Sequence, residues 1–379
     1  MARVQSRDSP ALPLAASDLA LPEQLTKRSL RPRLLAAAGV LAVVVAVVVL
    51  LPGLGGLRTR LSHAAPGWLL LGAALKVLSG VGYVMAFRMI FCRRMTWRVS
   101  YEVGMSELAA NALFPTGGAG GLALGAWALR RGGMAASEIA RRSVAFFLLT
   151  SVPNVAGVIV IGAALAIGVL GGEGNLLLTA LPAAVAAAAV AVTLQAGRFA
   201  QRREDHEAPG AQQKFSRRVR AFRASLTALA DGVAEAVALL REANMILIFG
   251  LFAYLVFDVM ILWATFRAIG PAPPLGALAM GYLIGELGGL IPIPGGIGGI
   301  DAGLVGTLVL YHVPLTAAAG AVLAYRAIAL WVPAIVGGAA FVALRRKLRR
   351  EADALSICAP NTEMDVIGVG RAIIGARTP

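Results

Sequence analysis

The sequence predicts an all-α polytopic membrane protein, and three observations support this fold class. Of the 379 residues, 58% are hydrophobic and 15% are charged, whereas about 25% of the residues of a soluble protein are charged. Apolar runs of about 20 residues, the length of a membrane-spanning helix, recur along the chain. The excess of Lys and Arg (35) over Asp and Glu (20) clusters between these runs, as in the cytoplasmic loops of membrane proteins.

Six apolar segments are predicted to cross the plasma (cytoplasmic) membrane as helices. They are residues 34–51, 68–91, 144–170, 175–193, 245–266 and 315–344. A signal peptide is the alternative for the first segment, but the 33-residue leader before it favours a retained helix. We predict a disordered basic leader over 1–33, a membrane domain over 34–350 and a polar tail over 351–379.

Two further segments, 95–125 and 275–312, are apolar but interrupted by Pro and clustered Gly. Basic residues cluster from Arg88 to Arg98 and again from Arg130 to Arg142, and such clusters face the cytoplasm. A single crossing between them would place one cluster outside. We therefore predict that 95–125 enters the membrane and returns as a broken re-entrant helical hairpin. The same counting of membrane crossings predicts that 275–312 enters from the outer side and returns to it, and it places both termini in the cytoplasm.

The two predicted hairpins resemble each other in sequence. Glu107 precedes Pro115 by eight positions and Glu286 precedes Pro294 by eight, and a Gly-Gly-x-Gly-Gly turn follows each Pro. The offset between the copies is about 178 residues, and it also relates their neighbouring spans. One copy starts outside and the other inside, which is typical of an inverted-topology repeat. Chance recurrence in a chain with 44 Gly is the alternative. The predicted copies cover about 67–170 and 245–344.

The hairpin turns are the first candidate ligand site. Irregular backbone at membrane depth is tolerated where protein or a water-filled cavity satisfies its polar groups. The helix N-termini after the turns carry partial positive charge and free N–H groups, which suit phosphate or carboxylate. Close helix packing is the alternative role for such glycines. The predicted turn residues are Gly117, Gly118, Gly295, Gly296, Gly298 and Gly299.

Ionisable residues at bilayer depth are costly and mark function by default. Arg326 lies about 11 residues into a long apolar segment, and its planar guanidinium suits bidentate phosphate binding. Glu286 and Asp301 flank the second turn. We expect them to bind a cationic head group, to take up a proton or to neutralise Arg326.

The first half of the chain holds the other candidates. Lys76 needs an acidic partner inside the membrane, and we predict Asp258, with Glu107 as the alternative. Glu107 and Asn111 lie in the first hairpin and are assigned to head-group binding, together with the turn residues. Capping or cross-linking of the hairpin is the alternative role of Asn111.

The polar segment after the fourth predicted span carries a basic amphipathic helix over about 212–242. Its apolar residues recur at three- and four-residue steps from Phe215 to Leu240, and arginines cluster from Arg217 to Arg223. Such a helix is typical of binding to an anionic inner leaflet. Nucleic-acid binding is disfavoured because no aromatic stacking platform accompanies the basic run. The oligomeric state cannot be read from this pattern.

No chemical motif predicts an enzyme. The sequence has no phosphate-binding loop and no nucleophile–base pair, and its three His and two Cys are scattered without a zinc-ligand spacing. We therefore expect no catalytic residues, no metal and no cofactor.

The second hairpin resembles a known family. Its run from Ile291 to Asp301, with Tyr325-Arg326 and Gly337, is similar to the lysylphosphatidylglycerol synthase transmembrane-region family, also called flippase-like. Asn111 and Pro115 match that family's first motif. The resemblance covers roughly 34–345.

This resemblance implies a lipid translocator that moves an anionic phospholipid or lipid-linked phosphate between leaflets. In multiple peptide resistance factors of this family, the membrane part moves aminoacylated phosphatidylglycerol, and a separate soluble domain attaches the amino acid. We expect this chain to lack that aminoacyl transferase domain. The alternative is a non-transporting membrane scaffold for a cell-envelope glycosyltransferase, with the basic segment as its docking surface.

Overall fold

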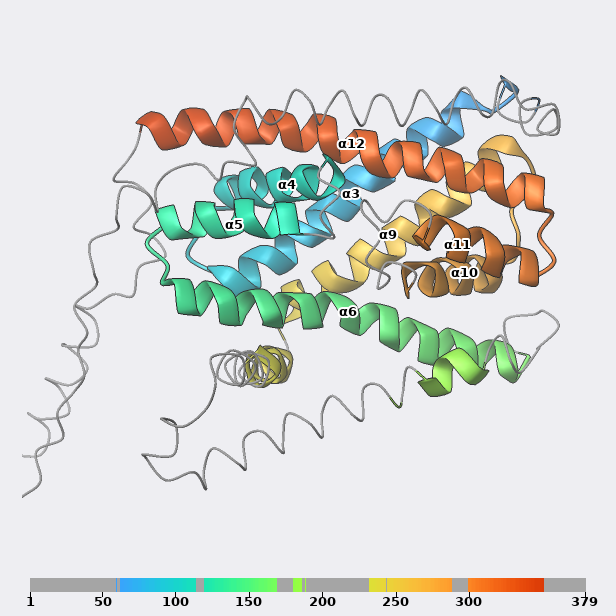
Figure 1. Ribbon diagram of the computed structural model, residues 1–379, viewed down its shortest axis with the longest axis horizontal. Coiled ribbons are helices and arrows are strands. Elements are labelled where there is room, and N and C mark those ends of the chain that lie inside the picture. The colour runs from blue at the N-terminus through green and yellow to red at the C-terminus, as the bar shows by residue number, and fades with distance from the viewer. Residues whose placement is uncertain are drawn as a thin grey trace, which may run out of the picture.

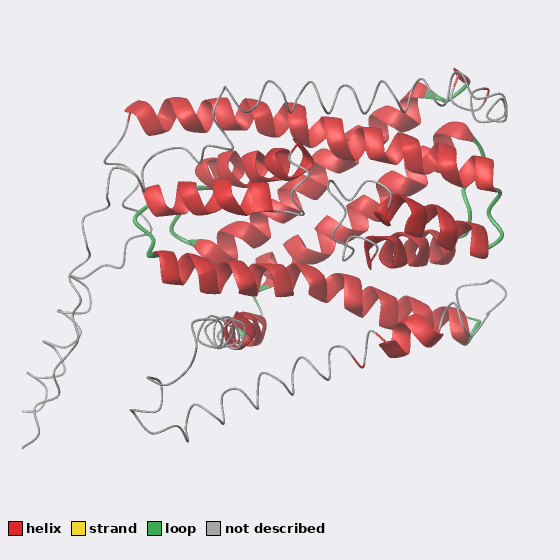
Figure 2. Cartoon of the chain, viewed as in Figure 1, coloured by secondary structure: helices red, strands yellow, loops and turns green. Residues whose placement is uncertain are grey.

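The computed structural model describes residues 62–113, 119–168, 232–242, 244–287 and 299–350, together with residues 59, 180–185 and 188. All regular structure within these residues is helical (Figure 2). The labelled helices are α3 (Pro66–Phe91), α4 (Trp97–Leu113), α5 (Ala119–Arg131), α6 (Ala136–Ala166), α9 (Met245–Ile269), α10 (Leu275–Leu287), α11 (Gly299–Leu310) and α12 (Leu315–Arg350). The predicted span 34–51 and most of the predicted span 175–193 lie outside the described residues.

Four of the described helices are long and apolar enough to cross a membrane. They are α3, α6, α9 and residues Leu315–Lys347 of α12, and they correspond to four of the predicted spans. The 25 residues of α9, for example, extend about 37 Å, which exceeds the roughly 30 Å hydrocarbon core of a bilayer. The chain is therefore a multi-pass membrane protein built from helices.

Local sequence sets the ends of these helices. Pro66 opens α3, where its missing N–H costs nothing. Asn244 caps α9, because its side chain accepts hydrogen bonds from the N–H groups of Ile246 and Leu247. α6 begins eight residues before the predicted apolar run, at Ala136, because its basic first turns continue the helix beyond the apolar segment.

Figure 1 shows how the helices are arranged. The long helices α12 and α6 lie along opposite sides of the bundle, and α3 and α9 run obliquely between them. The hairpin of α4 and α5 lies toward one end, and that of α10 and α11 lies toward the other. α3 and α9 pack along each other. Their backbones approach at Gly82 and Gly250, where a Cβ on Gly82 would lie 2.8 Å from the Gly250 carbonyl oxygen.

The helix packing keeps its pattern when α3–α6 are exchanged with α9–α12. Under this exchange α3 and α9 replace each other, so the contact between them is unchanged. The other extensive contacts occur in matched pairs: α4 with α12 and α10 with α6, α4 with α5 and α10 with α11, α3 with α6 and α9 with α12, α3 with α4 and α9 with α10, α3 with α12 and α9 with α6, and α5 with α6 and α11 with α12. The last helix of each set, α6 or α12, also contains one Pro: Pro153 in α6 and Pro333 in α12.

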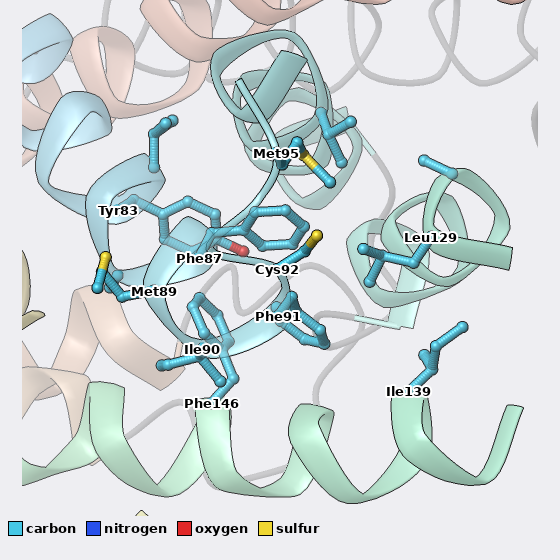
Figure 3. Close-up of a cluster of buried hydrophobic side chains, with 14 of the residues drawn as sticks. Tyr83, Phe87, Met89, Ile90, Phe91, Cys92, Met95, Leu129, Ile139 and Phe146 are labelled. Atoms are coloured by element: carbon cyan, nitrogen blue, oxygen red, sulfur yellow. The ribbon is translucent and has the colours of Figure 1, made fainter. Parts of the chain in front are cut away.

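Two hydrophobic clusters fill the opposite ends of the bundle. The first lies among α3, α4, α5 and α6, with residues of α9 and α12 added to it, and Figure 3 shows its aromatic centre at Phe87, Phe91 and Phe146. The Phe87 and Phe91 ring centroids are 4.7 Å apart, and the Phe91 and Phe146 centroids are 5.6 Å apart. The second cluster lies among α9, α10, α11 and α12.

Positive charge within the described residues is concentrated at one end of the bundle. The Lys and Arg residues of the α3–α4 turn, the ends of α5 and α12 and the start of α6 all lie there, and Arg267 lies at the opposite end. That opposite end is closed by a hydrogen bond from the Ala65 N–H to the Ala268 carbonyl, 2.8 Å long. This asymmetry is what the positive-inside rule produces in a membrane protein.

Candidate functional site

Arg326 and Asp301 form the charged centre of the second half. Arg326 lies within α12, and Asp301 lies in the first turn of α11. The Arg326 Nε donates a hydrogen bond to Asp301 Oδ1. The Arg326 side chain is 31% exposed and that of Asp301 is 27% exposed. The pair is therefore accessible at the margin of the bundle while it is held on two different helices.

One donor of Arg326 is unused. The Nη2 atom is buried and has no hydrogen-bond partner among the described residues. A buried donor without a partner costs about 1–3 kcal/mol, and more when it is charged. Asp301 occupies the Nε side of the guanidinium and also complements the positive end of α11. The guanidinium therefore keeps a donor that no described residue uses, and this donor suits an oxygen of an anionic ligand.

Lys76 and Asp258 form a buried ion pair where α3 meets α9. The Lys76 Nζ lies 2.9 Å from Asp258 Oδ1, and the side chains are 7% and 3% exposed. The Tyr282 hydroxyl donates a hydrogen bond to Asp258 Oδ2 at 3.2 Å. The Lys76 Nζ also lies 5.6 Å from the centre of the Tyr254 ring. Of the two acidic partners considered for Lys76, the structure brings Asp258 to it.

Tyrosines and Glu286 join these two pairs. The Tyr282 and Tyr325 rings lie edge to face with centroids 6.1 Å apart, and Tyr325 precedes Arg326 in α12. Glu286, in α10, interacts electrostatically with both Asp258 and Arg326. Polar side chains thus extend from the crossing of α3 and α9 to the junction of α11 and α12. Sequence reasoning missed the role of Tyr282, although a tyrosine in an apolar helix is a signal for a buried hydroxyl that needs a partner.

Glu107 does not join this network. It lies in α4, is 2% exposed, and forms no ion pair with any described residue. The carboxylate faces α5, where a Cβ on Gly125 would lie 3.1 Å from Glu107 Oε2. Tyr83 of α3 interacts with the same carboxyl group. Head-group binding by Glu107 stays a prediction.

Asn111 closes the first hairpin on itself. Its Oδ1 accepts a hydrogen bond of 2.9 Å from the Gly121 N–H, in the first turn of α5. A Cβ on Gly121 would lie 2.4 Å from the same oxygen. The side chain therefore caps α5 and fixes α4 against it, which is the structural role considered as the alternative for Asn111.

The predicted turn glycines lie almost entirely beyond the described residues. Gly299 is the first residue of α11. Gly117, Gly118, Gly295, Gly296 and Gly298 fall outside the described residues, so their role in ligand binding stays a prediction.

Comparison with known families gives one match. Residues 35–337 match the family described as the lysylphosphatidylglycerol synthase TM region. The chain belongs to this family. No match was found among curated proteins or among solved structures.

The lysylphosphatidylglycerol synthase transmembrane region covers every candidate residue described above. The matched range contains Lys76 at one extreme and Arg326 at the other, and it ends at Gly337 of α12. A Cβ on Gly337 would lie 2.0 Å from the Met105 carbonyl oxygen of α4. The family region thus ends at a residue of α12 that packs tightly on α4.

The basic end of this family member carries a docked helix over residues 232–241. Its Ala236 and Leu239 belong to the first hydrophobic cluster. Glu235 pairs with Arg141 of α6 at 3.8 Å, and Glu242 pairs with Arg93. This helix is the described end of the predicted amphipathic segment; residues 212–231 lie outside the described residues.

Proposed function

We propose that this member of the lysylphosphatidylglycerol synthase transmembrane-region family moves an anionic phospholipid or a lipid-linked phosphate between the leaflets of the plasma membrane. The observation that carries the proposal is the buried Nη2 of Arg326, which has no hydrogen-bond partner among the described residues. A phosphate oxygen is the acceptor that a guanidinium binds best. The proposal involves no covalent chemistry, so it requires no nucleophile and no cofactor.

The path begins at the Arg326–Asp301 pair. A lipid phosphate accepts a hydrogen bond from Nη2 and competes with Asp301 for the remaining donors of the guanidinium. Glu286 interacts electrostatically with both Asp258 and Arg326, so we expect it to balance the charge that changes in this exchange. The head group follows the polar side chains between the hairpins, while the acyl chains stay in the lipid because their burial costs nothing there.

The proposal includes the inverted repeat, with two re-entrant hairpins, six spans and both termini in the cytoplasm. The matched pairs of helix contacts support it, since a two-fold axis relating α3–α6 to α9–α12 would produce this pattern. The hairpins lie toward opposite ends of the bundle (Figure 1), as an inverted repeat requires. In repeats of this kind, alternating access arises when one repeat rocks against the other around a central site.

The basic segment before α9 is proposed to lie on the anionic inner leaflet. In the docked helix, Ala236 and Leu239 turn toward the protein, whereas Leu240 is 36% exposed. An apolar face therefore remains for lipid beside the basic end of the bundle.

The test is lipid exchange in proteoliposomes with head-group-labelled phosphatidylglycerol. We expect Arg326→Ala to slow the exchange at least tenfold, because a charged hydrogen bond contributes about 1.5–3 kcal/mol. Arg326→Lys keeps the charge but not the planar guanidinium, so we expect its exchange rate to fall between those of the wild type and Arg326→Ala. Arg267→Ala is the matched control, because this arginine lies outside the polar path and contacts the Trp68 ring.

Equal exchange by the wild type and Arg326→Ala would contradict the proposal. A scaffold makes a different prediction. If the protein only docked a glycosyltransferase, removal of residues 212–224 would abolish its role, and neither this deletion nor Arg326→Ala would change leaflet exchange.

A further inference from the structure

We propose that Glu107 is a proton-binding residue, whose carboxyl group is neutral while the first hairpin is packed as in this structure and ionises when the hairpin opens. The inference does not depend on lipid exchange being the function, and its measurements are separate from those of transport.

The carboxyl group of Glu107 is buried inside the first hairpin. Glu107 is 2% exposed, and its Oε2 has no hydrogen-bond partner among the described residues. The cost of keeping an uncompensated charge inside a protein is several kcal/mol. A carboxyl group in this position avoids that cost by holding a proton. The proton belongs on Oε2, the oxygen that no donor reaches.

The described residues around Glu107 offer it no cation. α3 presents Tyr83, which interacts with the carboxyl group as a neutral donor. α5 presents Gly125, and α12 presents Gly337 against Met105 and Ala109, which flank Glu107 in α4. These three helices are the ones that pack extensively on α4.

The charged residues nearby on the same helices have other partners. Lys76 of α3 pairs with Asp258, and Arg326 of α12 pairs with Asp301. Arg88 of α3 donates to the Met95 carbonyl at 2.7 Å. Glu102, one turn before Glu107 in α4, pairs with Arg98 at 3.2 Å. Arg130 and Arg131 lie at the far end of α5.

The second hairpin provides the contrast. Its glutamate at the equivalent position, Glu286, interacts with the cation Arg326 and lies near Asp301. At the 179-residue offset that relates Glu286 to Glu107, Arg326 corresponds to Phe147 and Asp301 to Leu122. The first hairpin thus has the glutamate but no cation at the matching position. One hairpin holds a site for an anion, and the other holds a carboxyl group whose simplest partner is a proton.

Protonation of Glu107 depends on the packing of α5 against α4, and Gly125 is the residue that allows this packing. Because residue 125 has no side chain, α5 closes directly over the carboxyl group, with its backbone close to Oε2. Separation of α5 from α4 would admit water to Oε2 and release the proton. The packed form therefore binds one proton more than the open form, and raising the pH favours opening.

Infrared spectroscopy of the full chain in nanodiscs tests the proposal. We expect the wild type at pH 7 to show a protonated carboxyl band that Glu107→Gln lacks. Glu102→Gln is the matched control and keeps the band, because Glu102 is ion-paired. We also expect the thermal stability of the wild type to fall between pH 6 and pH 9, and Glu107→Gln to lose at least half of that fall.

The opposite results overturn the proposal. If the difference between wild type and Glu107→Gln is an ionised carboxylate band, Glu107 is not protonated in the packed form. If both proteins lose stability equally with rising pH, the proton is not linked to packing. Glutamine is nearly isosteric with a neutral glutamic acid, so a Glu107→Gln protein that fails to fold also contradicts a neutral carboxyl group.

Discussion

Lys76 and Asp258 lie 182 residues apart in the chain and form a buried ion pair at the crossing of α3 and α9, with Nζ 2.9 Å from Oδ1 and 3.0 Å from Oδ2. The pair holds together the two helices that would correspond to each other in the proposed repeat. Charges at this depth are tolerated because each satisfies the other, and Tyr282 adds a further hydrogen bond.

Removing one member of this pair should destabilise the protein strongly. Lys76→Met leaves Asp258 buried without its cation, and we expect a loss of about 3–5 kcal/mol in the free energy of unfolding. The double variant Lys76→Met with Asp258→Leu leaves no charge behind, so it should recover most of that loss. Thermal unfolding in detergent measures both. A double variant as unstable as the single one would show that the pair is needed for more than neutralisation.

The hydroxyl of Tyr282 is predicted to stabilise the same pair. Tyr282→Phe removes the hydrogen bond to Asp258, and we expect a loss of about 1.5–3 kcal/mol because the acceptor is charged. Tyr101→Phe is the control, since Tyr101 is half-buried against the first hydrophobic cluster. Equal thermal stability of the two variants would contradict a structural role of the Tyr282 hydroxyl.

Much of the fold could be predicted from the sequence. Four predicted spans correspond to α3, α6, α9 and α12, because long apolar runs leave few alternatives in a membrane protein. The rarity of charge inside these runs also marked Lys76, Asp258 and Arg326 as residues that need partners.

The choice of partner was harder to predict. Asp258 and Glu107 were both available to Lys76, and the outcome depends on how α3 crosses α9 at Gly82 and Gly250, a geometry that no local pattern encodes. The part of Tyr282 was missed for the same reason, since its hydroxyl reaches a carboxylate on another helix. The start of α6 was placed too late because hydropathy marks the apolar segment and not the helix that continues beyond it.

Two adjacent glycines of α12 allow a controlled test of helix packing. A Cβ on Gly337 would lie 2.0 Å from the Met105 carbonyl oxygen, whereas a Cβ on Gly338 would have no neighbour within 4 Å. Gly337→Ala must therefore push α12 away from α4, at a cost of about 1–3 kcal/mol or more. Gly338→Ala should stay within about 0.5 kcal/mol of the wild type. Similar thermal stabilities of the two variants would show that α12 does not pack on α4 so closely.

Cysteine accessibility tests the hairpin topology. Arg98, whose side chain is 83% exposed, lies at the start of the first hairpin, and Arg130 lies at its end. With Cys92 and Cys358 replaced by Ser, we expect Arg98→Cys and Arg130→Cys to resist a membrane-impermeant maleimide in intact cells and to react after permeabilisation. His63→Cys and His312→Cys lie in exposed segments at the opposite end of the bundle, so they should react in intact cells. If positions 98 and 130 are labelled from different sides, α4 and α5 together cross the membrane once. The second repeat would then no longer be inverted relative to the first, and the two-fold arrangement proposed for lipid exchange would fail.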